Sequence, residues 1–423
     1  MEARIIRRSV VTIAVGLAMG SAGVAHATNG YFAHGYGTKA KGMGGVGMAI
    51  SQDSYAPGIN PAGIAGMESR IDGSLAYFRP ERSVTFNDMG DMTIDSDSED
   101  FFIPSIGYVQ QIDENRSWGI ALLGNGGLNT DYPAFDRQCQ NPQDPNGPLV
   151  PGQGVFCSGS AGVDLEQLAI IPTYAQKFAD GRVSVGFSPI ISYQRFSAKG
   201  IEAFNQASAE GDTGSGSGTD TTWGYGAQIG FQAELAEGAR VGASYRSKIR
   251  NGDFDDYSGL FADGGSFDVP STYGLGFSVD VSPSVTLSAD YQRINYTDVA
   301  AISNPGDSGL LGAPNGAGFG WQDIDIFKFG AQYEAGNDWT WRVGYNRGEN
   351  PIPSSEVEFN ILAPAVMEDH FTFGFTKGFG NQHELNFAAM YAPRQSVRGP
   401  TQQGEATIEM RQYELEIGYA YRF

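Results

Sequence analysis

The chain has 423 residues, with 27 lysines and arginines against 48 aspartates and glutamates, and a formal net charge of −21. A chain this acidic lacks the basic surface that a nucleic-acid-binding protein needs, so we expect no nucleic-acid partner. Its 59 glycines, 20 tyrosines and 26 phenylalanines instead suit antiparallel strands whose aromatic rings lie at a membrane boundary.

The first 27 residues have the three parts of a secretory signal peptide. Three arginines within the first eight residues precede an apolar run over residues 10–19, and Ala25-His26-Ala27 supplies an A-x-A cleavage site. The run is shorter than the roughly 20 apolar residues that a membrane-spanning helix needs. We therefore predict export and cleavage after Ala27. Loss of the three arginines and Glu2 leaves 24 basic and 47 acidic residues, a net charge of −23.

Residues 28–69 form a glycine-rich segment that lacks a sustained two-residue period. Within it, Gly42-Met43-Gly44-Gly45-Val46-Gly47 matches the G-x-G-x-x-G pattern of dinucleotide-binding turns. Such a turn needs a preceding strand and a following helix, and an exported chain without a βαβ pattern supplies neither. We expect Gly42, Gly44, Gly45 and Gly47 instead to let the backbone turn tightly and approach a neighbouring wall closely.

From Arg70 onward, the chain divides into segments of about ten residues in which apolar and polar side chains alternate. This period of two, with breaks that are alternately short and long, is typical of an outer-membrane barrel with periplasmic turns and external loops. The fourteen predicted strands cover residues 70–79, 101–111, 117–127, 164–178, 182–195, 222–234, 240–250, 268–279, 284–296, 323–334, 339–348, 368–378, 383–392 and 409–423.

The last strand shows the alternation most clearly. From 412 to 423 every odd position is apolar or aromatic, every even position is polar or small, and the chain ends on Phe423. A terminal strand ending on an aromatic residue is typical of outer-membrane barrels, and we expect the barrel assembly machinery to recognise it. Because lipid offers no hydrogen-bond partners to an edge strand, the sheet must close. We predict an all-β fold, a 14-stranded antiparallel transmembrane β-barrel, acting as a monomer in the outer membrane of a Gram-negative bacterium.

The alternation also assigns side chains to the two faces of the wall. It places Val241, Ala243, Tyr245, Ile249, Trp339, Trp341, Val343 and Tyr345 toward lipid, and Arg240, Arg246, Lys248, Arg250 and Arg342 toward the lumen. A carboxylate ligand would need a positive partner, so Arg246, Lys248 and Arg342 are candidate ligand-binding residues. The alternative is that these three side chains pair with some of the many acidic residues.

Two cysteines, Cys139 and Cys157, lie in one Pro- and Gly-rich loop. Their spacing matches no metal or redox motif, and in an exported chain a single pair on one loop is most simply a disulfide. A pair of free thiols is the alternative. We expect neither a cofactor nor a bound metal.

Short motifs along the whole mature chain carry a resemblance. They are Asn29-Gly30-Tyr31-Phe32, the Gly42–Gly47 run, Asn60-Pro61-Ala62-Gly63, YFRP at 77–80, LGNGGLNTDYP at 123–133, GVDLEQLAIIPTYAQKF at 162–178 and the terminal strand. In this order they resemble the FadL family of long-chain fatty acid and hydrocarbon uptake channels. The resemblance implies a barrel over residues 70–423 whose lumen is plugged by an N-terminal hatch, residues 28–69.

The resemblance also implies passive uptake of a hydrophobic ligand. The ligand would be captured at an external apolar groove, pass to a site beside Tyr31 and Phe32, and leave sideways where the third strand kinks inward. Asn60, Pro61 and Ala62 match the hatch motif of the family. Gly124, Asn125, Gly126 and Gly127 of the third predicted strand would form the kink; alternatively, these glycines only begin a long loop.

We expect long-chain fatty acids as ligands, with aromatic or aliphatic hydrocarbons taken up by the same route as the alternative. The surrounding partners would be outer-membrane lipids and lipopolysaccharide. A general porin has no use for a 42-residue segment ahead of its barrel. A lipid hydrolase would need a serine, a histidine and a polar orienting group together. The mature chain has only His34, His370 and His383, with no serine that the sequence singles out, so we expect no enzymatic activity.

Overall fold

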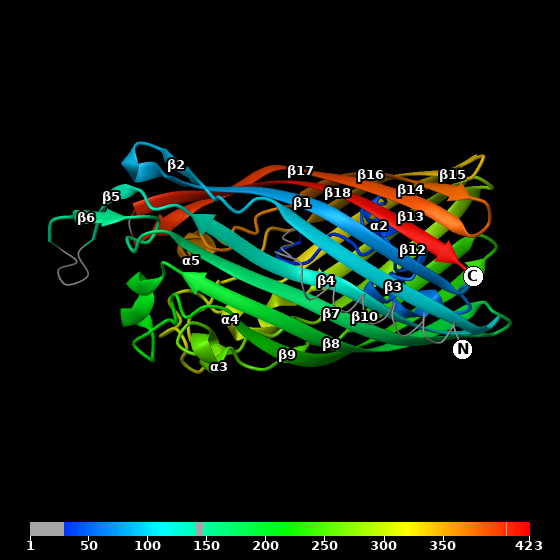
Figure 1. Ribbon diagram of the computed structural model, residues 1–423, viewed down its shortest axis with the longest axis horizontal. Helices are drawn as coiled ribbons and strands as arrows, with labels where there is room; N and C mark the ends of the chain where they lie inside the picture. The colour runs from blue at the N-terminus through cyan, green and yellow to red at the C-terminus, as the bar shows by residue number, and fades with distance from the viewer. Residues whose placement is uncertain (1–28, 141–146, 403) are drawn as a thin grey trace, which may run out of the picture.

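The computed structural model describes residues 29–140, 147–402 and 404–423, so the signal peptide predicted over residues 1–27 lies outside the described part. Fourteen long antiparallel strands, each hydrogen-bonded to the next, form a closed barrel (Figure 1). They are β1 (Arg70–Phe86), β3 (Phe101–Asp113), β4 (Arg116–Tyr132), β7 (Ala161–Phe178), β8 (Val183–Lys199), β9 (Asp220–Ala236), β10 (Ala239–Arg246), β12 (Thr272–Ser282), β13 (Val285–Ile294), β14 (Ile324–Gly336), β15 (Trp339–Gly348), β16 (Asp369–Phe379), β17 (His383–Thr401) and β18 (Gly404–Arg422).

The barrel closes where β18 pairs with β1, from Arg70↔Arg422 to Phe86↔Ala406. Closure gives every barrel strand a hydrogen-bonded neighbour on both sides, as a lipid environment requires. The 14-stranded antiparallel fold predicted from the alternation is therefore confirmed. The first barrel strand, β1, begins at Arg70.

Short elements accompany the barrel. They are β2 (Met92–Asp95), β5 (Asp136–Cys139), β6 (Val150–Gln153), β11 (Arg250–Asn251), α2 (Thr38–Lys41), α3 (Ala262–Gly265), α4 (Ala300–Ser303), α5 (Val357–Asn360), η1 (Ala56–Gly58), η2 (Pro61–Ile64), η3 (Asn87–Met89), η4 (Glu202–Ala207), η5 (Asp255–Tyr257), η6 (Tyr296–Asp298) and η7 (Ser354–Glu356). None of the helices in the described ranges is long and apolar enough to cross a membrane.

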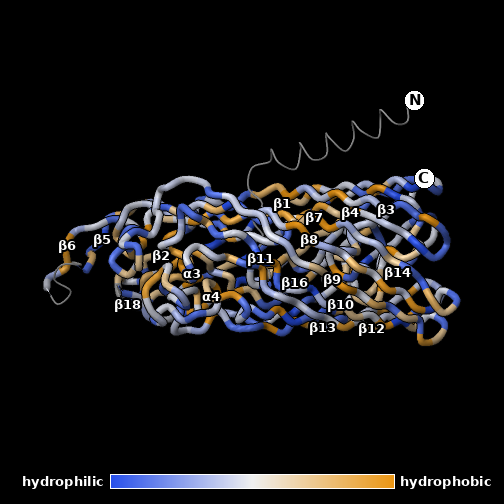
Figure 2. Tube along the Cα trace, turned by 90° about the horizontal axis from the view of Figure 1, so that it is seen from below, coloured by the Kyte–Doolittle hydropathy of each residue, from blue (hydrophilic) through white to orange (hydrophobic). Residues whose placement is uncertain are grey.

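The two faces of the wall differ as the period of two predicts. In β18, Leu415 and Ile417 are 49% and 59% exposed on the outside, whereas Glu414 and Glu416 are only 2% exposed on the inside. Hydrophobic and hydrophilic segments accordingly recur along the strands (Figure 2). The outer face is therefore apolar, and the acidic side chains between its residues point into the lumen.

The predicted disulfide is present. Cys139, at the end of β5, is bonded to Cys157, which follows the hairpin that β5 forms with β6. The bond fastens this hairpin within the long loop between β4 and β7.

Two predictions of face are wrong. Ile249 is predicted to face lipid, but it is 1% exposed within the apolar core. Arg250 is predicted to face the lumen, but it is exposed beside its partner in β9, Tyr225, which is 68% exposed on the outer face. The regular strand β10 ends at Arg246, and Ile249 instead bridges Val269 in an external loop, so the alternation no longer applies there. β17 and β18 each run for 19 residues: β17 continues past its predicted end at residue 392, and β18 begins before its predicted start at residue 409.

Candidate functional site

The N-terminal segment, defined here as residues 29–69, lies inside the barrel (Figure 1). Its three short helices are α2, η1 and η2. Asn60 caps η2, because its side-chain oxygen accepts a hydrogen bond from Ala62 N at 3.0 Å and Pro61 occupies the first turn. The Asn60 amide also donates to the carbonyl of Phe231 in β9 at 3.0 Å. The Asn60-Pro61-Ala62 motif thus fixes both a helix start and a contact with the wall.

The G-x-G-x-x-G stretch packs its backbone directly against the wall. Gly44 and Gly45 have φ angles of +71° and +82°, a conformation that other residues rarely adopt. A β-carbon at Gly44 would lie 2.8 Å from the carbonyl oxygen of Tyr345, and one at Gly344 would lie 2.0 Å from the nitrogen of Gly44. Glycines on both sides of this contact therefore allow an approach that no larger residue would permit.

Two further glycines of the stretch also lie against the wall. A β-carbon at Gly42 would lie 3.1 Å from Cα of Gly374 in β16. The backbone N–H of Gly47 donates to the carboxylate of Asp290 in β13 at 2.7 Å. No strand precedes the stretch within the described part of the segment, so it is not a dinucleotide-binding turn.

Buried ion pairs tie the segment to one side of the barrel. Lys41 Nζ lies 2.5 Å from Glu414 and 2.7 Å from Glu416, both on β18. Lys39 Nζ lies 2.7 Å from Glu384 on β17. Burial alone would lower the pKa of Lys41, but the carboxylates of Glu414 and Glu416 raise it above its ordinary value. The lysine is therefore charged, and its charge is matched only while the segment is seated.

A pair of histidines, one from the N-terminal segment and one from β16, lies close to Lys41 and Lys328. His34 and His370 are fully buried, and their rings stack with centroids 6.2 Å apart. Among the described residues, their ring nitrogens form no hydrogen bond of standard geometry. Burial lowers the pKa of His34 to about 3, helped by the charges of Lys41 and Lys328, so this ring is neutral.

An aromatic cluster surrounds the start of the segment. The rings of Tyr31 and Phe32 stack at 5.0 Å, and Tyr31 also contacts Tyr296 at 5.7 Å and Trp321 at 6.1 Å. The Tyr296 hydroxyl donates to the carbonyl of Asn29 at 2.7 Å. The residues predicted to flank the internal site are thus buried among rings contributed by the external loops.

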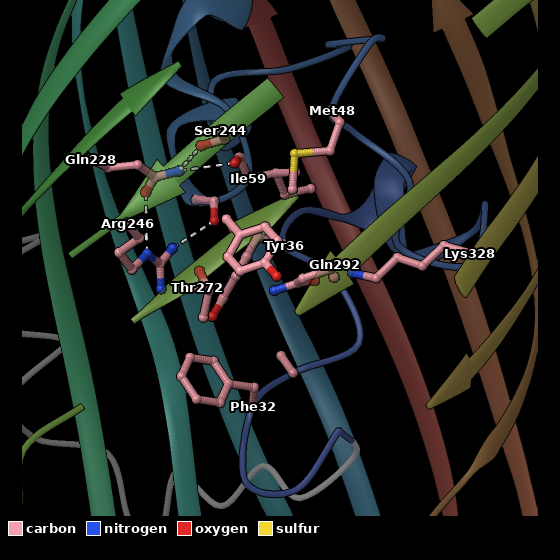
Figure 3. Close-up of a pocket in the computed structure, with 14 residues that line it drawn as sticks. Phe32, Tyr36, Met48, Ile59, Gln228, Ser244, Arg246, Thr272, Gln292 and Lys328 are labelled. Atoms are coloured by element: carbon pink, nitrogen blue, oxygen red, sulfur yellow. Dashed lines mark hydrogen bonds between the residues drawn. The ribbon is translucent and has the colours of Figure 1, made fainter. Parts of the chain in front are cut away.

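A cavity opens beside Phe32, between the N-terminal segment and strands β9 to β14. Its lining includes Phe32, Tyr36, Met48, Ile59, Gln228, Ser244, Arg246, Thr272, Gln292 and Lys328 (Figure 3). The lining combines apolar side chains with two cations, which suits an amphipathic ligand better than a purely polar one.

The two cations of the cavity are held by neutral groups. Arg246 donates to Asn125 Oδ1 at 2.9 Å, to Gly58 O at 2.7 Å and to Gln228 Oε1 at 3.2 Å. Lys328 Nζ donates to the carbonyl of His34 at 3.0 Å. In the described part of the chain, no carboxylate oxygen lies within 4.0 Å of either cation, although both side chains are 4% exposed. The nearest counter-charge of Lys328 is the buried carboxylate of Asp290, its cross-strand partner on β13.

The three predicted cationic residues have different surroundings. Arg246 lines the cavity. Lys248 follows the end of β10 and forms an ion pair with Asp268 at 2.8 Å, apart from the cavity lining. Arg342 points inward as predicted, but it donates to Gln52 and Thr376 under the N-terminal segment and does not line the cavity.

Lys328 was missed by sequence reasoning. In Ile326-Phe327-Lys328-Phe329-Gly330 it occupies the inward register between two lipid-facing phenylalanines, and that alternation is the signal that could have identified it. The sequence does not reveal which of several inward cations converge, because that depends on strand register around the whole barrel.

The predicted kink region lies in β4. Between Gly124 and Gly126 the pairing with β7 shifts by one residue, so Asn125 is the extra residue of a β-bulge. Gly126 forms a bridge with Phe32, and Gly127 N donates to the carbonyl of Tyr31 at 3.3 Å. These residues are part of a strand, so they do not merely begin a loop.

The pairing of β4 with its other neighbour, β3, is incomplete. The ladder between β3 and β4 stops at Ile106↔Leu122, whereas β3 continues to pair with β1 as far as Phe101. Farther out, Asp97 N donates to Asp131 O at 2.7 Å. Between Leu122 and Asp131, β4 therefore has no ladder pairs with β3, and we call this part of the wall the side window; the Arg82 side chain lies across it and donates to Asn129 O and Ser98 O.

Comparison with known proteins places the chain in a family. The model of the family described as outer membrane protein transport protein (OMPP1/FadL/TodX) matches residues 156–417. The long-chain fatty acid transport protein of Salmonella typhi is 21% identical over 398 residues, covering 84% of this chain and 85% of its own. The protein of the same name from Escherichia coli K12 is 21% identical over 410 residues, covering 84% and 86%.

Solved structures share the fold. The toluene transporter TodX of Pseudomonas putida has a TM-score of 0.68 at 18% identity and covers 92% of this chain and 99% of its own. A FadL homologue from Pseudomonas aeruginosa has a TM-score of 0.66 at 14% identity, covering 93% and 100%. Because the family match extends over more than half of the sequence, this chain belongs to the OMPP1/FadL/TodX family of outer-membrane transport proteins.

Proposed function

We propose that this protein carries long-chain fatty acids passively across the outer membrane. The observation that carries the proposal is the pair of buried cations, Arg246 and Lys328, in one cavity beside Phe32. Neither cation is in an ion pair with a carboxylate of the described chain, and a fatty acid supplies one together with an apolar tail. The fatty acid transport proteins of Salmonella and Escherichia coli among its relatives support this ligand class.

An aromatic path supports entry from outside. Buried rings follow one another from Phe196, near the outer end of β8, through an external loop to Tyr31, which stacks on the cavity residue Phe32: Phe196 to Phe261 at 4.8 Å, Phe261 to Phe267 at 4.9 Å, and Phe267 to Tyr31 at 6.3 Å. Exposing apolar surface to water costs roughly 25 cal/mol per Å², so a hydrophobic ligand moves along such a path more readily than through water.

In this proposal the N-terminal segment is the hatch and the side window is the exit. The hatch fills the lumen below the cavity, whereas the window between β3 and β4 opens beside Phe32 and Gly126. A ligand that leaves through the window enters the membrane without passing the hatch or returning to water.

Hydrocarbons are the second candidate ligands. The cluster of Tyr31, Phe32, Tyr296 and Trp321 offers aromatic rings that a small aromatic molecule could stack on. The toluene transporter TodX, with the same fold, supports this alternative. For either ligand we propose a channel without a catalytic step; among the described residues, no serine hydroxyl hydrogen-bonds to the ring nitrogens of His34 or His370.

Arg246→Gln tests the anchor. Loss of the guanidinium should weaken oleate binding about tenfold to a hundredfold, the usual effect of one charge-assisted hydrogen bond, and leave hexadecane and toluene binding unchanged. Binding is measured on the purified protein by displacement of a fluorescent fatty acid.

The matched control is Arg342→Gln, which also removes a buried, inward-facing arginine held by neutral partners but does not alter the cavity lining. Equal oleate affinity of wild type and Arg246→Gln would refute the anchor. An equal loss in both variants would mean that the effect comes through the hatch and not through the ligand.

Deletion of Asn125 tests the window. Without its extra residue, β4 can pair regularly, and the window should narrow, so that oleate uptake into cells falls about tenfold or more. Asn125→Ala keeps the bulge and controls for the lost side chain, and deletion of Ile112 removes the bulge residue at the periplasmic end of β3. If the Asn125 deletion variant takes up oleate as fast as the Ile112 deletion variant, the side window is not the exit.

A further inference from the structure

A pattern on the outer surface occurs three times. In each copy, one strand runs toward the external loops and carries Tyr-x-Arg. The neighbouring strand, which follows the next external loop, carries Asp-x-Phe at its start. The copies are Tyr77-Phe78-Arg79 with Asp100-Phe101-Phe102, Tyr291-Gln292-Arg293 with Asp325-Ile326-Phe327, and Tyr345-Asn346-Arg347 with Asp369-His370-Phe371. They lie at the strand pairs β1 and β3, β13 and β14, and β15 and β16, which fall within eight consecutive strands of the barrel, from β13 through β18 and β1 to β3; Asp100 directly precedes β3.

Each copy makes the same contacts. In the second, Tyr291 stacks on Phe327 with centroids 5.5 Å apart and donates its hydroxyl to Asp325 at 2.8 Å, and Arg293 pairs with the same carboxylate at 2.8 Å. The third copy has a Tyr345–Phe371 stack at 5.3 Å, with both Tyr345 and Arg347 bonded to Asp369. The first has a Tyr77–Phe102 stack at 5.5 Å, with both Tyr77 and Arg79 bonded to Asp100.

The Tyr-Arg-Asp clusters, as we call these three sets, mark one boundary of the apolar belt. Below them, Phe329 and Phe373 on the same outer face are 51% and 41% exposed to lipid. The middle residue of each Tyr-x-Arg is turned into the lumen, so tyrosine and arginine share the outer face. Because the clusters lie toward the long loops, the lipid headgroups at their level belong to the outer leaflet.

The arginines keep accessible surface despite their partners. Their side chains are 39%, 29% and 56% exposed for Arg79, Arg293 and Arg347. Exposed ion pairs contribute little to stability, so barrel stability alone does not explain three copies of one arrangement at this boundary. A guanidinium binds phosphate oxygens through paired hydrogen bonds, and a carboxylate binds divalent cations.

We propose that the Tyr-Arg-Asp clusters bind lipopolysaccharide of the outer leaflet. The arginines contact the phosphates of its lipid anchor, and the aspartates share the divalent cations that bridge those phosphates. Each arginine also pairs with a second carboxylate, Glu99, Asp323 or Glu368, so each cluster carries both signs with an excess of negative charge. Such a cluster needs the divalent cations of the lipopolysaccharide layer to bind its phosphates, whereas a purely basic patch would suit any anionic lipid. The stacked tyrosine and phenylalanine pack against the start of the acyl chains.

The test uses the full mature protein in detergent with magnesium present, incubated with purified deep-rough lipopolysaccharide or with phosphatidylglycerol. Lipid that stays bound through gel filtration is measured by mass spectrometry. The variant Arg79→Gln with Arg293→Gln and Arg347→Gln should retain about tenfold less lipopolysaccharide than wild type, with phosphatidylglycerol retention unchanged. Removal of magnesium with a chelator should lower wild-type retention to a similar extent.

The control is Arg116→Gln, which breaks an equally exposed ion pair with Asp113 in a periplasmic turn and should retain lipopolysaccharide like wild type. Wild-type retention by the triple variant, an equal loss in Arg116→Gln, or equal retention of phosphatidylglycerol and lipopolysaccharide by wild type would each overturn the proposal. If the triple variant does not fold, Arg347→Gln alone, at the most exposed of the three positions, should still lower retention about threefold.

Discussion

Replacing Gly344 with leucine is expected to displace the N-terminal segment while the barrel still forms. Even the β-carbon of a residue at 344 would lie 2.0 Å from the nitrogen of Gly44 and 2.1 Å from the carbonyl carbon of Met43. Neither neighbour is a side chain that could rotate away. Overpacking costs about 1–3 kcal/mol even where side chains can adjust. The ratio of molecules with a seated segment to molecules with a displaced segment should therefore fall about fivefold to a hundredfold.

Two measurements report that displacement. In planar bilayers, ion conductance should rise as the lumen opens. In detergent, trypsin should cut after Lys39 and Lys41, which are 6% and 5% exposed in the seated segment. The control is Gly73→Leu, because a β-carbon at Gly73 would meet nothing within 4 Å. A Gly344→Leu protein with wild-type conductance and wild-type trypsin resistance would show that the close packing of this stretch does not hold the segment in place.

The fold could be predicted because lipid imposes a simple rule on every strand. A side chain that faces lipid must be apolar, and the next side chain along the strand points into the lumen. The faces of Leu415, Ile417 and Arg342 therefore follow from position alone. Where the strand ends, the rule ends, and Ile249 was assigned to the wrong face for that reason. The disulfide could also be predicted, since only two cysteines exist and both lie in one loop.

The site could be predicted only in part. Tyr31, Phe32 and the glycines around Asn125 followed from short motifs, and Arg246 from the alternation. Lys328 did not, because its place beside Arg246 depends on the register of the strands from β10 to β14. The contact partners of the N-terminal segment could not be predicted from the sequence either, since Lys41 and Glu414 are 373 positions apart and no local pattern joins them.

Lys41→Met is expected to release the same segment by a different mechanism. Glu414 and Glu416 are both 2% exposed, and Lys41 is the cation that contacts both of them. Without the lysine, two like charges remain buried side by side. Breaking a buried ion pair in this way costs about 3–5 kcal/mol of stability, several times the cost of breaking an exposed ion pair. Moving the segment out of the lumen lets water reach both carboxylates, so displacement relieves the cost.

The variant should therefore show increased ion conductance and faster hydrogen exchange in residues 37–48. Lys199→Met, which breaks an exposed pair with Asp131, is the matched control and should leave both unchanged. Adding Glu414→Gln and Glu416→Gln to Lys41→Met removes the stranded charges and should restore the seated segment, because the amides keep the shape of the carboxylates. If the triple variant stays as open as Lys41→Met, the lysine acts through its packing and not through its charge, and the electrostatic account of the anchor fails.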